Sequence, residues 1–324
     1  FELGIGRISV PTGQWLGGGA LGRSRLSSNS TMQPQPVILL APSVLGLDGT
    51  GVNQLGDALL EAGLAARLNA PVIARVDAPP QNPVRHPEHG MLNSDTLAGY
   101  TVTLADAVEP ILARGEFPLV LGGDCTILLG NLLALRRRGR FGLLFIDAHA
   151  DFYQPEANVN GEGASSELAL ATGRGPHGLT RFEHHERLID DEDVVVFGFR
   201  DLDEQRHFGS QPLAPGIHAM DLAEVRRLGV EHALGRALAH LTRAELAGFW
   251  IHFDADVLDD AIMPAVKYHL PDGFSWDEIV SILRTALACD RAVGLEVTIY
   301  DPTLDPSRRA ARGLVDAIAR GFTR

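Results

Sequence analysis

Short apolar runs alternate along the chain with longer segments in which apolar residues recur every three or four positions. The short runs are typical of strands that are buried on both faces, and the longer segments are typical of helices that bury one face. We expect strands at residues 37–41, 71–76, 117–121, 141–146, 194–199, 217–220, 249–253 and 292–299. We expect helices at residues 52–68, 96–114, 127–138, from about 221 through 241, 276–288 and 308–322.

This alternation predicts an α/β fold, with a mostly parallel sheet between helices. No internal repeat or linker follows residue 32, so residues 32–324 are expected to form a single domain. Residues 1–31 differ, because they are rich in Gly, Ser and Arg and lack periodicity. We interpret them as a tag-like or disordered N-terminal segment. A native arm that packs on a neighbouring subunit is the alternative.

Composition excludes several classes of partner. The chain has 324 residues and a formal net charge of −13, which argues against a nucleic acid or an anionic membrane as the main partner. Two cysteines are too few for a disulfide scaffold, so a reducing cytoplasm is the expected location. No apolar run approaches the roughly 20 residues that cross a bilayer.

Three metal-competent side chains follow the strand expected at residues 141–146. Asp147, His149 and Asp151 alternate with apolar residues. In an extended strand, side chains at positions i, i+2 and i+4 point to one face. Two carboxylates and an imidazole are costly to bury unless something neutralises them. A divalent cation does so directly, and the triplet therefore predicts a metal site.

Three more polar motifs follow expected strands. They are Gly122-Gly123-Asp124-Cys125, Arg200-Asp201-Leu202-Asp203 and His252-Phe253-Asp254-Ala255-Asp256. Ligands bind beyond the carboxyl ends of parallel strands, where these motifs would meet. So many acids call for more than one cation. Two divalent ions with bridging carboxylates, about 3.5–4 Å apart, are the natural solution.

In order and spacing, these motifs resemble those of the ureohydrolase superfamily of arginases, agmatinases and formiminoglutamases. That family carries Gly-Gly-Asp-His, Asp-Ala-His-x-Asp and Ser-Phe-Asp-x-Asp-x-x-Asp-Pro motifs, and three motifs in order are far more specific than one. The resemblance covers about residues 37–322. It implies a sheet of roughly eight strands between helix layers and a homo-oligomer, either a trimer or a hexamer. It also implies hydrolysis of a guanidino or amidine-type C–N bond in a small molecule by a metal-bridging hydroxide.

The resemblance also implies the ligands. Asp147, Asp151 and Asp254 match ligands that bridge or serve both metals, and His149 and Asp256 match ligands of one metal. Manganese is the metal that the family implies.

Three further assignments depend on the resemblance. Cys125 occupies the position of the family's other histidine ligand. Because a thiolate is softer than an imidazole, Zn²⁺, Fe²⁺ and Co²⁺ become alternatives to Mn²⁺. A protonated thiol beside a weakly occupied metal site is the other interpretation. Asp203 matches an aspartate that contacts the substrate's α-amino group, and Asp151 is placed to accept or relay the hydroxide proton.

The chain departs from the family pattern where protons are transferred. Ala164 or Ser165 stands where the family has its proton-shuttle histidine. Glu162 or Glu167 is a candidate to relay protons instead, and Glu162 is our catalytic candidate. Taken individually, each glutamate is typical of an ordinary surface acid.

The substrate-reading positions also differ. Ile299 falls on the family glutamate that holds the guanidinium, and Glu296 falls on an earlier aspartate. Asp260 replaces a proline after the third motif. A divergent ureohydrolase therefore fits better than an arginase. Two alternatives remain, a catalytically silent relative that binds metal or a small molecule, and a single-zinc deacetylase of related fold.

Overall fold

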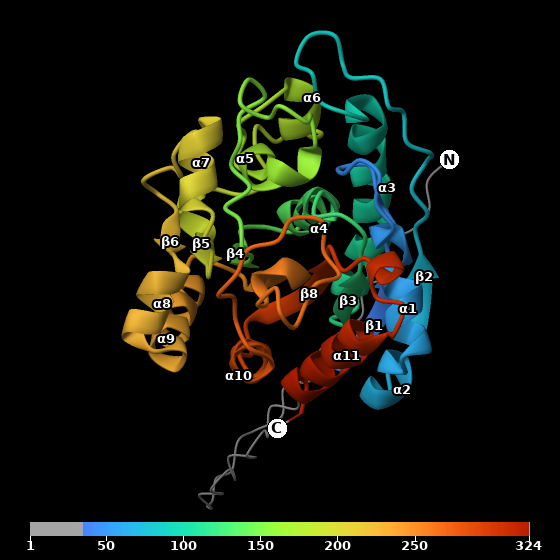
Figure 1. The fold of residues 1–324 in the computed structure, drawn as a ribbon, viewed down its shortest axis with the longest axis vertical. Coiled ribbons are helices and arrows are strands. Elements are labelled where there is room, and N and C mark those ends of the chain that lie inside the picture. Colours follow the sequence, from blue (N-terminus) through green and yellow to red (C-terminus); the bar gives the residue numbers. More distant parts are fainter. Residues whose placement is uncertain (1–34, 324) are drawn as a thin grey trace, which may run out of the picture. The chain divides into compact units, whose positions relative to one another are not determined.

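The computed structural model describes residues 35–323, which fold around one eight-stranded sheet (Figure 1). All strand pairs are parallel, in the order β2-β1-β3-β8-β7-β4-β5-β6. The strands are β1 (Pro36–Leu40), β2 (Val72–Arg75), β3 (Phe117–Leu121), β4 (Gly142–Ile146), β5 (Val194–Phe197), β6 (His218–Met220), β7 (Phe249–Asp254) and β8 (Ala292–Thr298). The prediction of a parallel α/β sheet of about eight strands is confirmed.

Helices cover both faces of the sheet (Figure 1). One hydrophobic core contains residues of α1, α2 and α8–α11, and the other contains residues of α3–α6. Because successive strand residues point to opposite faces, Ile146 joins the first core and Phe145 the second. The α-helices are α1 (Leu55–Glu61), α2 (Leu64–Leu68), α3 (Ser94–Ala113), α4 (Ile127–Arg136), α5 (Glu167–Ala171), α6 (His177–Thr180), α7 (Leu202–Phe208), α8 (Leu222–Leu228), α9 (Val230–Leu241), α10 (Trp276–Leu287) and α11 (Arg309–Gly321).

Two segments predicted as continuous helices are divided. The segment expected at residues 52–68 forms a 3-10 turn, α1 and α2, with a break at Gly63, whose φ of 95° is left-handed. The helical segment after β6 breaks at Gly229, where φ is 84°. Glycine adopts such angles without steric cost, so both breaks are encoded locally. Helices α5, α6 and α7 were not predicted, because segments of 5, 4 and 7 residues are too short to show a helical period.

The strands that carry the polar motifs are neighbours in the sheet. β8 lies between β3 and β7, and β4 lies between β7 and β5. Their registers match Leu121 with Val297, and Phe253 with both Val297 and Ile146. The segments that follow these strands therefore meet at one edge of the sheet, as the sequence predicts.

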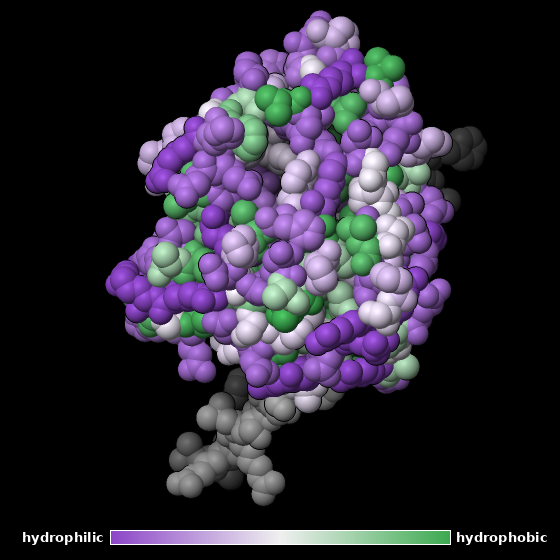
Figure 2. Space-filling model, in the orientation of Figure 1, coloured by the Kyte–Doolittle hydropathy of each residue, from purple (hydrophilic) through white to green (hydrophobic). Residues whose placement is uncertain are grey.

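Among residues 35–323, no helix is both long and apolar enough to cross a membrane. On the face shown in Figure 2, hydrophilic residues predominate and apolar residues form only small groups. The segment interpreted as tag-like, residues 1–31, lies outside the described residues. The assignment of residues 32–324 to a single domain stays a prediction.

Candidate metal centre

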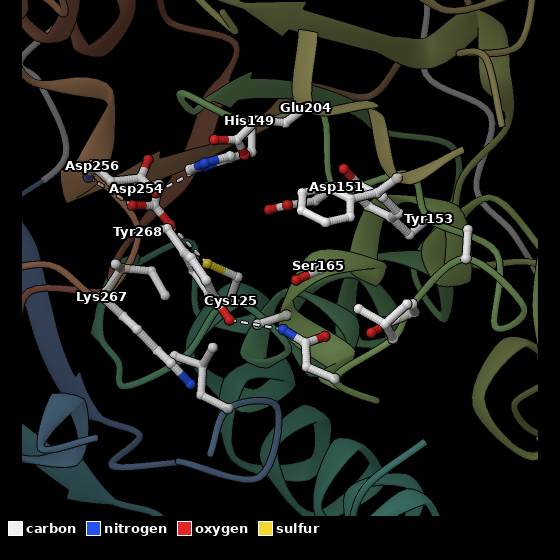
Figure 3. Close-up of a pocket in the computed structure, with 18 residues that line it drawn as sticks. Cys125, His149, Asp151, Tyr153, Ser165, Glu204, Asp254, Asp256, Lys267 and Tyr268 are labelled. Atoms are coloured by element: carbon white, nitrogen blue, oxygen red, sulfur yellow. Dashed lines mark hydrogen bonds and ion pairs between the residues drawn. The ribbon is translucent and has the colours of Figure 1, made fainter. Parts of the chain in front are cut away.

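The segment after β4 is a tight loop. β4 ends at Ile146, the backbone N–H of His149 donates to Asp147 Oδ1 at 2.7 Å, and Asp151 adopts a φ of 45°. The expectation of an extended strand through these residues is therefore wrong, because bonding between side chain and backbone turns the chain. The three side chains still converge. Asp147 is fully buried, and His149 and Asp151 line one cavity (Figure 3).

The segment after β7 contacts this loop directly. Asp254 ends β7, and its Oδ1 accepts a hydrogen bond from the N–H of Asp256 at 2.7 Å. Asp256 then accepts from the N–H of Ala148 at 3.2 Å, and its Oδ2 lies 2.9 Å from His149 Nδ1. The two aspartate-rich motifs are thus joined as the sequence predicts (Figure 3).

Cys125 lies between β3 and α4 and is buried. Its Sγ is 2.8 Å from Asp254 Oδ2 and 3.5 Å from Thr298 Oγ1. Burial, reinforced by the negative charge of Asp254, raises the pKa of the Cys125 thiol well above its usual range. Without a cation, Cys125 is therefore a thiol that donates to Asp254, whereas a nearby cation favours the thiolate. The Cys125 sulfur lies where the resemblance implies a metal ligand, and binding of a metal by this sulfur stays a prediction.

Glu167, interpreted from the sequence as a surface acid, is fully buried. It begins helix α5, and neither of its carboxylate oxygens has a hydrogen-bond partner. Burial, together with the charge of Asp147, raises the pKa of Glu167 well above its usual range. The surface interpretation is wrong because α5 is buried along its whole length. The signal that could have revealed this is the apolar run Leu168-Ala169-Leu170-Ala171 directly after the acid.

Two groups of donor atoms lie close enough to hold cations. The members of each group lie within 4.8 Å of one another, and the groups are Cys125, Asp147, Glu167 and His252, and Asp147, His149 and Asp256. Asp147 belongs to both, as a bridging carboxylate would. Both oxygens of Glu167 are buried without hydrogen-bond partners, and Asp147 Oδ2 and His252 Nε2 are buried with no partner except each other, at 3.4 Å. Buried donors left unpaired in this way fit divalent cations.

His252 is a buried residue to which the sequence motifs assign no role. Its ring stacks on Phe145 with centroids 4.5 Å apart, and its Nδ1 lies 2.6 Å from Glu296 Oε1. Its Nε2 lies 3.4 Å from Asp147 Oδ2. Burial alone would lower the pKa of His252, but Asp147 and Glu296 outweigh it and raise the pKa to about 10. In the absence of a cation, His252 is therefore a buried imidazolium that stabilises the ionised Asp147 carboxylate.

A cavity of about 150 Å³ opens onto these groups (Figure 3). The acids, the imidazole and the sulfur at its base are Asp151, Asp254, Asp256, His149 and Cys125, and its wall includes Leu47, Tyr153, Ala157, Asn158, Val159, Asn160, Ala164, Ser165, Glu204, Phe208, Lys267, Tyr268 and Ile299. The structure thus places five of the six predicted ligands at the cavity base, with Asp147 buried beside them.

The residues at two positions where the chain departs from the family pattern line the cavity wall. They are Ala164 and Ser165, either of which is expected at the position of the proton-shuttle histidine, and Ile299, which is expected at that of the guanidinium-binding glutamate. Ile299 has a φ of 72°, which costs a β-branched residue about 1–3 kcal/mol. Its backbone N–H donates to the carbonyl oxygen of Gly123 at 2.9 Å, which ties it to the turn after β3.

Glu162 is also buried, with 1% exposure, so the surface interpretation is wrong for it too. Its Oε1 accepts from the N–H of Asp48 at 2.9 Å and pairs with Lys267, and its Oε2 accepts from the Tyr268 hydroxyl at 2.5 Å and the Asn160 amide at 3.0 Å. We call Glu162, Asn160, Lys267 and Tyr268 the Glu162 network. The three partners line the cavity, whereas Glu162 lies behind them. Its catalytic assignment is untested.

Asp203 does not line the cavity. Its side chain is 97% exposed and lies 2.8 Å from Arg206. Glu204, the next residue of α7, lines the cavity instead. The assignment of Asp203 to the substrate's amino group stays a prediction.

Comparisons with known proteins agree with this geometry. The model of the arginase family matches residues 45–322. The arginase of Staphylococcus aureus (strain MRSA252) is 26% identical over 294 residues, which cover 88% of this chain and 96% of the relative. The structure of the arginase from Bacillus caldovelox is similar with a TM-score of 0.78 at 25% identity, covering 90% of this chain and 99% of that one. Formimidoylglutamase from Bacillus subtilis subsp. subtilis str. 168 shares the fold, with a TM-score of 0.65 at 17% identity over 89% and 85% of the two chains.

Fold and site together define a hydrolase of the ureohydrolase superfamily. Within it, this chain belongs to the arginase family, and the modest identities make it a divergent member.

Proposed function

We propose that this chain hydrolyses a guanidino or other amidine-type C–N bond of a small molecule at a centre of two divalent cations. The supporting observation is that Asp147 belongs to two groups of buried donor atoms. Mn²⁺ is the first candidate because most donors are carboxylate oxygens, and sulfur from Cys125 would favour Zn²⁺, Fe²⁺ or Co²⁺.

In this proposal the two ions share several ligands. Asp147, Asp151 and Asp254 would hold both ions, His149 and Asp256 would hold one, and Cys125 would hold the other. When bound, such a pair makes hydroxide available from water near neutral pH and polarises the bond to be cleaved. His149 and Asp256 are held in place by their 2.9 Å contact, which fixes that side of the site before the substrate enters.

The chain's own residues then handle the protons. Asp151 lines the cavity and is placed to accept the proton released by the attacking water and to return it to the leaving nitrogen. Glu162 is the second proton-relay candidate. Because it lies behind the cavity wall, it acts through the Tyr268 hydroxyl, which donates to it at 2.5 Å.

The cavity wall favours a substrate other than arginine. With Ile299 and Ala164 in the wall, a guanidinium lacks the charge-assisted partner that the family glutamate would give it. We therefore propose a modified guanidine, a formimino group or another amidine as the reacting end. A substrate amino group would contact an acid of α7. Asp203 is the candidate that the resemblance implies, and Glu204 is the candidate that lines the cavity.

Metal analysis coupled to a substrate panel tests this proposal. We expect two divalent ions per chain, and release of ammonia, urea or a related product from one class of guanidino or amidine compound. Asp254→Asn should abolish release. Asp259→Asn is the matched control, because Asp259 accepts from the N–H groups of Ala261 and Gly273 and does not line the cavity. If Asp151→Asn and Asp254→Asn leave activity unaltered, the mechanism fails.

The same experiment separates the alternatives. A catalytically silent relative would bind metal but release no product from any compound. A single-zinc deacetylase would hold one ion per chain.

The assembly and the location of the protein are also proposed. The resemblance suggests a trimer or hexamer, which light scattering of the purified protein would measure. Cysteine usage suggests the cytoplasm.

A further inference from the structure

We propose that Glu167 is a ligand of the cation on the Cys125 side of the centre, a ligand that the family motifs do not supply. This inference rests on the proposed metal site and specifies its donor set. It concerns an acid that lies deeper than the cavity lining and outside every motif that carries the resemblance.

The first argument is the unpaired state of the carboxylate. Glu167 is fully buried, and both of its oxygens lack hydrogen-bond partners. Within residues 35–323, it is the one carboxylate with both oxygens buried and unpartnered. An isolated ionised carboxylate is strongly disfavoured in such a place, and a cation removes the penalty.

The second argument is position. A Glu167 oxygen lies within 4.8 Å of the donor atoms of Cys125, Asp147 and His252. All four residues are fully or almost fully buried. A cation between Asp147 and Glu167 would therefore be reached by both carboxylates at once, and Cys125 would lie beside it.

The third argument is how the backbone holds Glu167. The N–H of Ala169 donates to the carbonyl oxygen of Asp151 at 3.3 Å, so the first turn of α5 is tied to the β4 loop. Leu168 and Ala169 are themselves fully buried, which fixes the helix against the second core. Glu167 is thus positioned by the same loop that positions Asp147 and Asp151.

Ligation by Glu167 would compensate for the replacement of the family histidine by Cys125. The chain lacks the histidine of the family motif there, and Glu167 supplies an anionic oxygen on the same side of the centre. The ion on that side then has a mainly oxygen donor set, which is the set that Mn²⁺ prefers.

Metal titration of the metal-stripped full chain tests this inference without relying on activity. Mn²⁺ binding is followed by calorimetry and electron paramagnetic resonance, and Co²⁺ binding by its visible spectrum and its thiolate-to-cobalt absorption. We expect Glu167→Gln to weaken one of the two binding events at least about tenfold and to leave the other unchanged. The Co²⁺ spectrum of the weakened site should also change, because the ion there loses an oxygen donor.

The matched control is Glu162→Gln. Glu162 is equally buried and lies five positions earlier, but its oxygens already have partners. This variant should bind both ions as the unaltered chain does. Thermal melting of the metal-free variants excludes loss of folding as the cause.

Each outcome is decisive. If Glu167→Gln binds metal like the unaltered chain while Asp254→Asn loses metal, the ligand assignment is overturned and the proposed function stands. An unaltered chain that binds neither Mn²⁺ nor Co²⁺ would overturn the proposed function and this inference together.

Discussion

Glu162 and Glu167 are both buried acids, five residues apart, yet their surroundings are opposite. Glu162 has four partners that satisfy both of its oxygens, including the chain's single lysine, Lys267. Glu167 has no donor group as a partner, and its neighbours are the acids Asp147, Asp151 and Asp254, of which Asp151 could pair with it only if one of the two carboxyls carried a proton. The first arrangement needs no ligand, and in the second a cation would supply the missing partner, as we propose. Burial alone therefore does not distinguish the two acids, whereas the presence or absence of hydrogen-bond partners does.

The largest expected effect is at the residue common to both donor groups. Asp147→Asn weakens a ligand of both ions, so activity on the substrate found by the panel should fall more than about 100-fold. Metal content measured by mass spectrometry should fall with it. If the variant keeps two ions per chain and full activity, the two groups do not share Asp147.

Removing a partner from the Glu162 network should reduce stability. Lys267→Met leaves a buried carboxylate without its cation, which should cost about 2 kcal/mol, discounted because the lysine is 29% exposed. Chemical denaturation measures this change. Glu162→Gln in the same chain should recover most of the loss, because it removes the unpaired charge. Additive losses in the double variant would show that the two residues do not interact.

The carboxylate cluster should respond to pH in the opposite sense to an ordinary acid. Burial and neighbouring acids raise the pKa values of Asp151, Glu167 and Asp254 in the folded, metal-free protein above their unfolded values. Their contribution to stability is therefore present below the unfolded pKa and is lost as pH rises through the folded pKa. Melting temperature without metal should be higher near pH ~5 than near pH ~8.

Adding Mn²⁺ should reverse this trend, because the cation binds the ionised acids. Glu167→Gln should flatten the metal-free pH profile. Equal slopes in this variant and the unaltered chain would contradict the assignment of the raised pKa to the cluster.

The smallest effect is expected on α7. Glu204→Gln should raise KM for an amino-bearing substrate by about threefold to tenfold, because Glu204 lines the cavity and a charge-assisted contact is worth about 1 kcal/mol in partial solvent. Asp203→Asn should change KM less, since the Asp203 side chain is 97% exposed. Steady-state kinetics on both variants decides between them. A larger effect at Asp203 would mean that α7 presents its acids differently when the substrate binds.

Sequence patterns predicted the sheet and the edge at which the site forms. Apolar runs identify buried parallel strands, and the polar motif after each run marks the carboxyl end of its strand. Asp147, Asp254 and Asp256 could be placed in this way, since each lies at the end of a strand or within two residues of it. The turn at Asp151 could not, because its left-handed φ depends on contacts made by the folded loop.

Glu167 and His252 escaped prediction for a different reason. Each looks ordinary in the sequence, one as an acid after two serines and the other as a residue within a strand. The role of Glu167 depends on the lack of hydrogen-bond partners around its carboxylate. The role of His252 depends on its contact with Glu296, which belongs to strand β8. Such pairings join distant segments, and local sequence does not encode them.

The position of β8 in the sheet also sets the order of events when the protein matures. β8 is the last strand along the chain, but it lies between β3, which precedes Cys125, and β7, which ends at Asp254. In a ribosome-bound chain that lacks residues 292–298, the strand between β3 and β7 is missing, and we expect the sulfur and this carboxylate to stay apart. Uptake of the proposed cations should therefore follow the insertion of β8 into the middle of the sheet, and metal content would report how many molecules have finished folding.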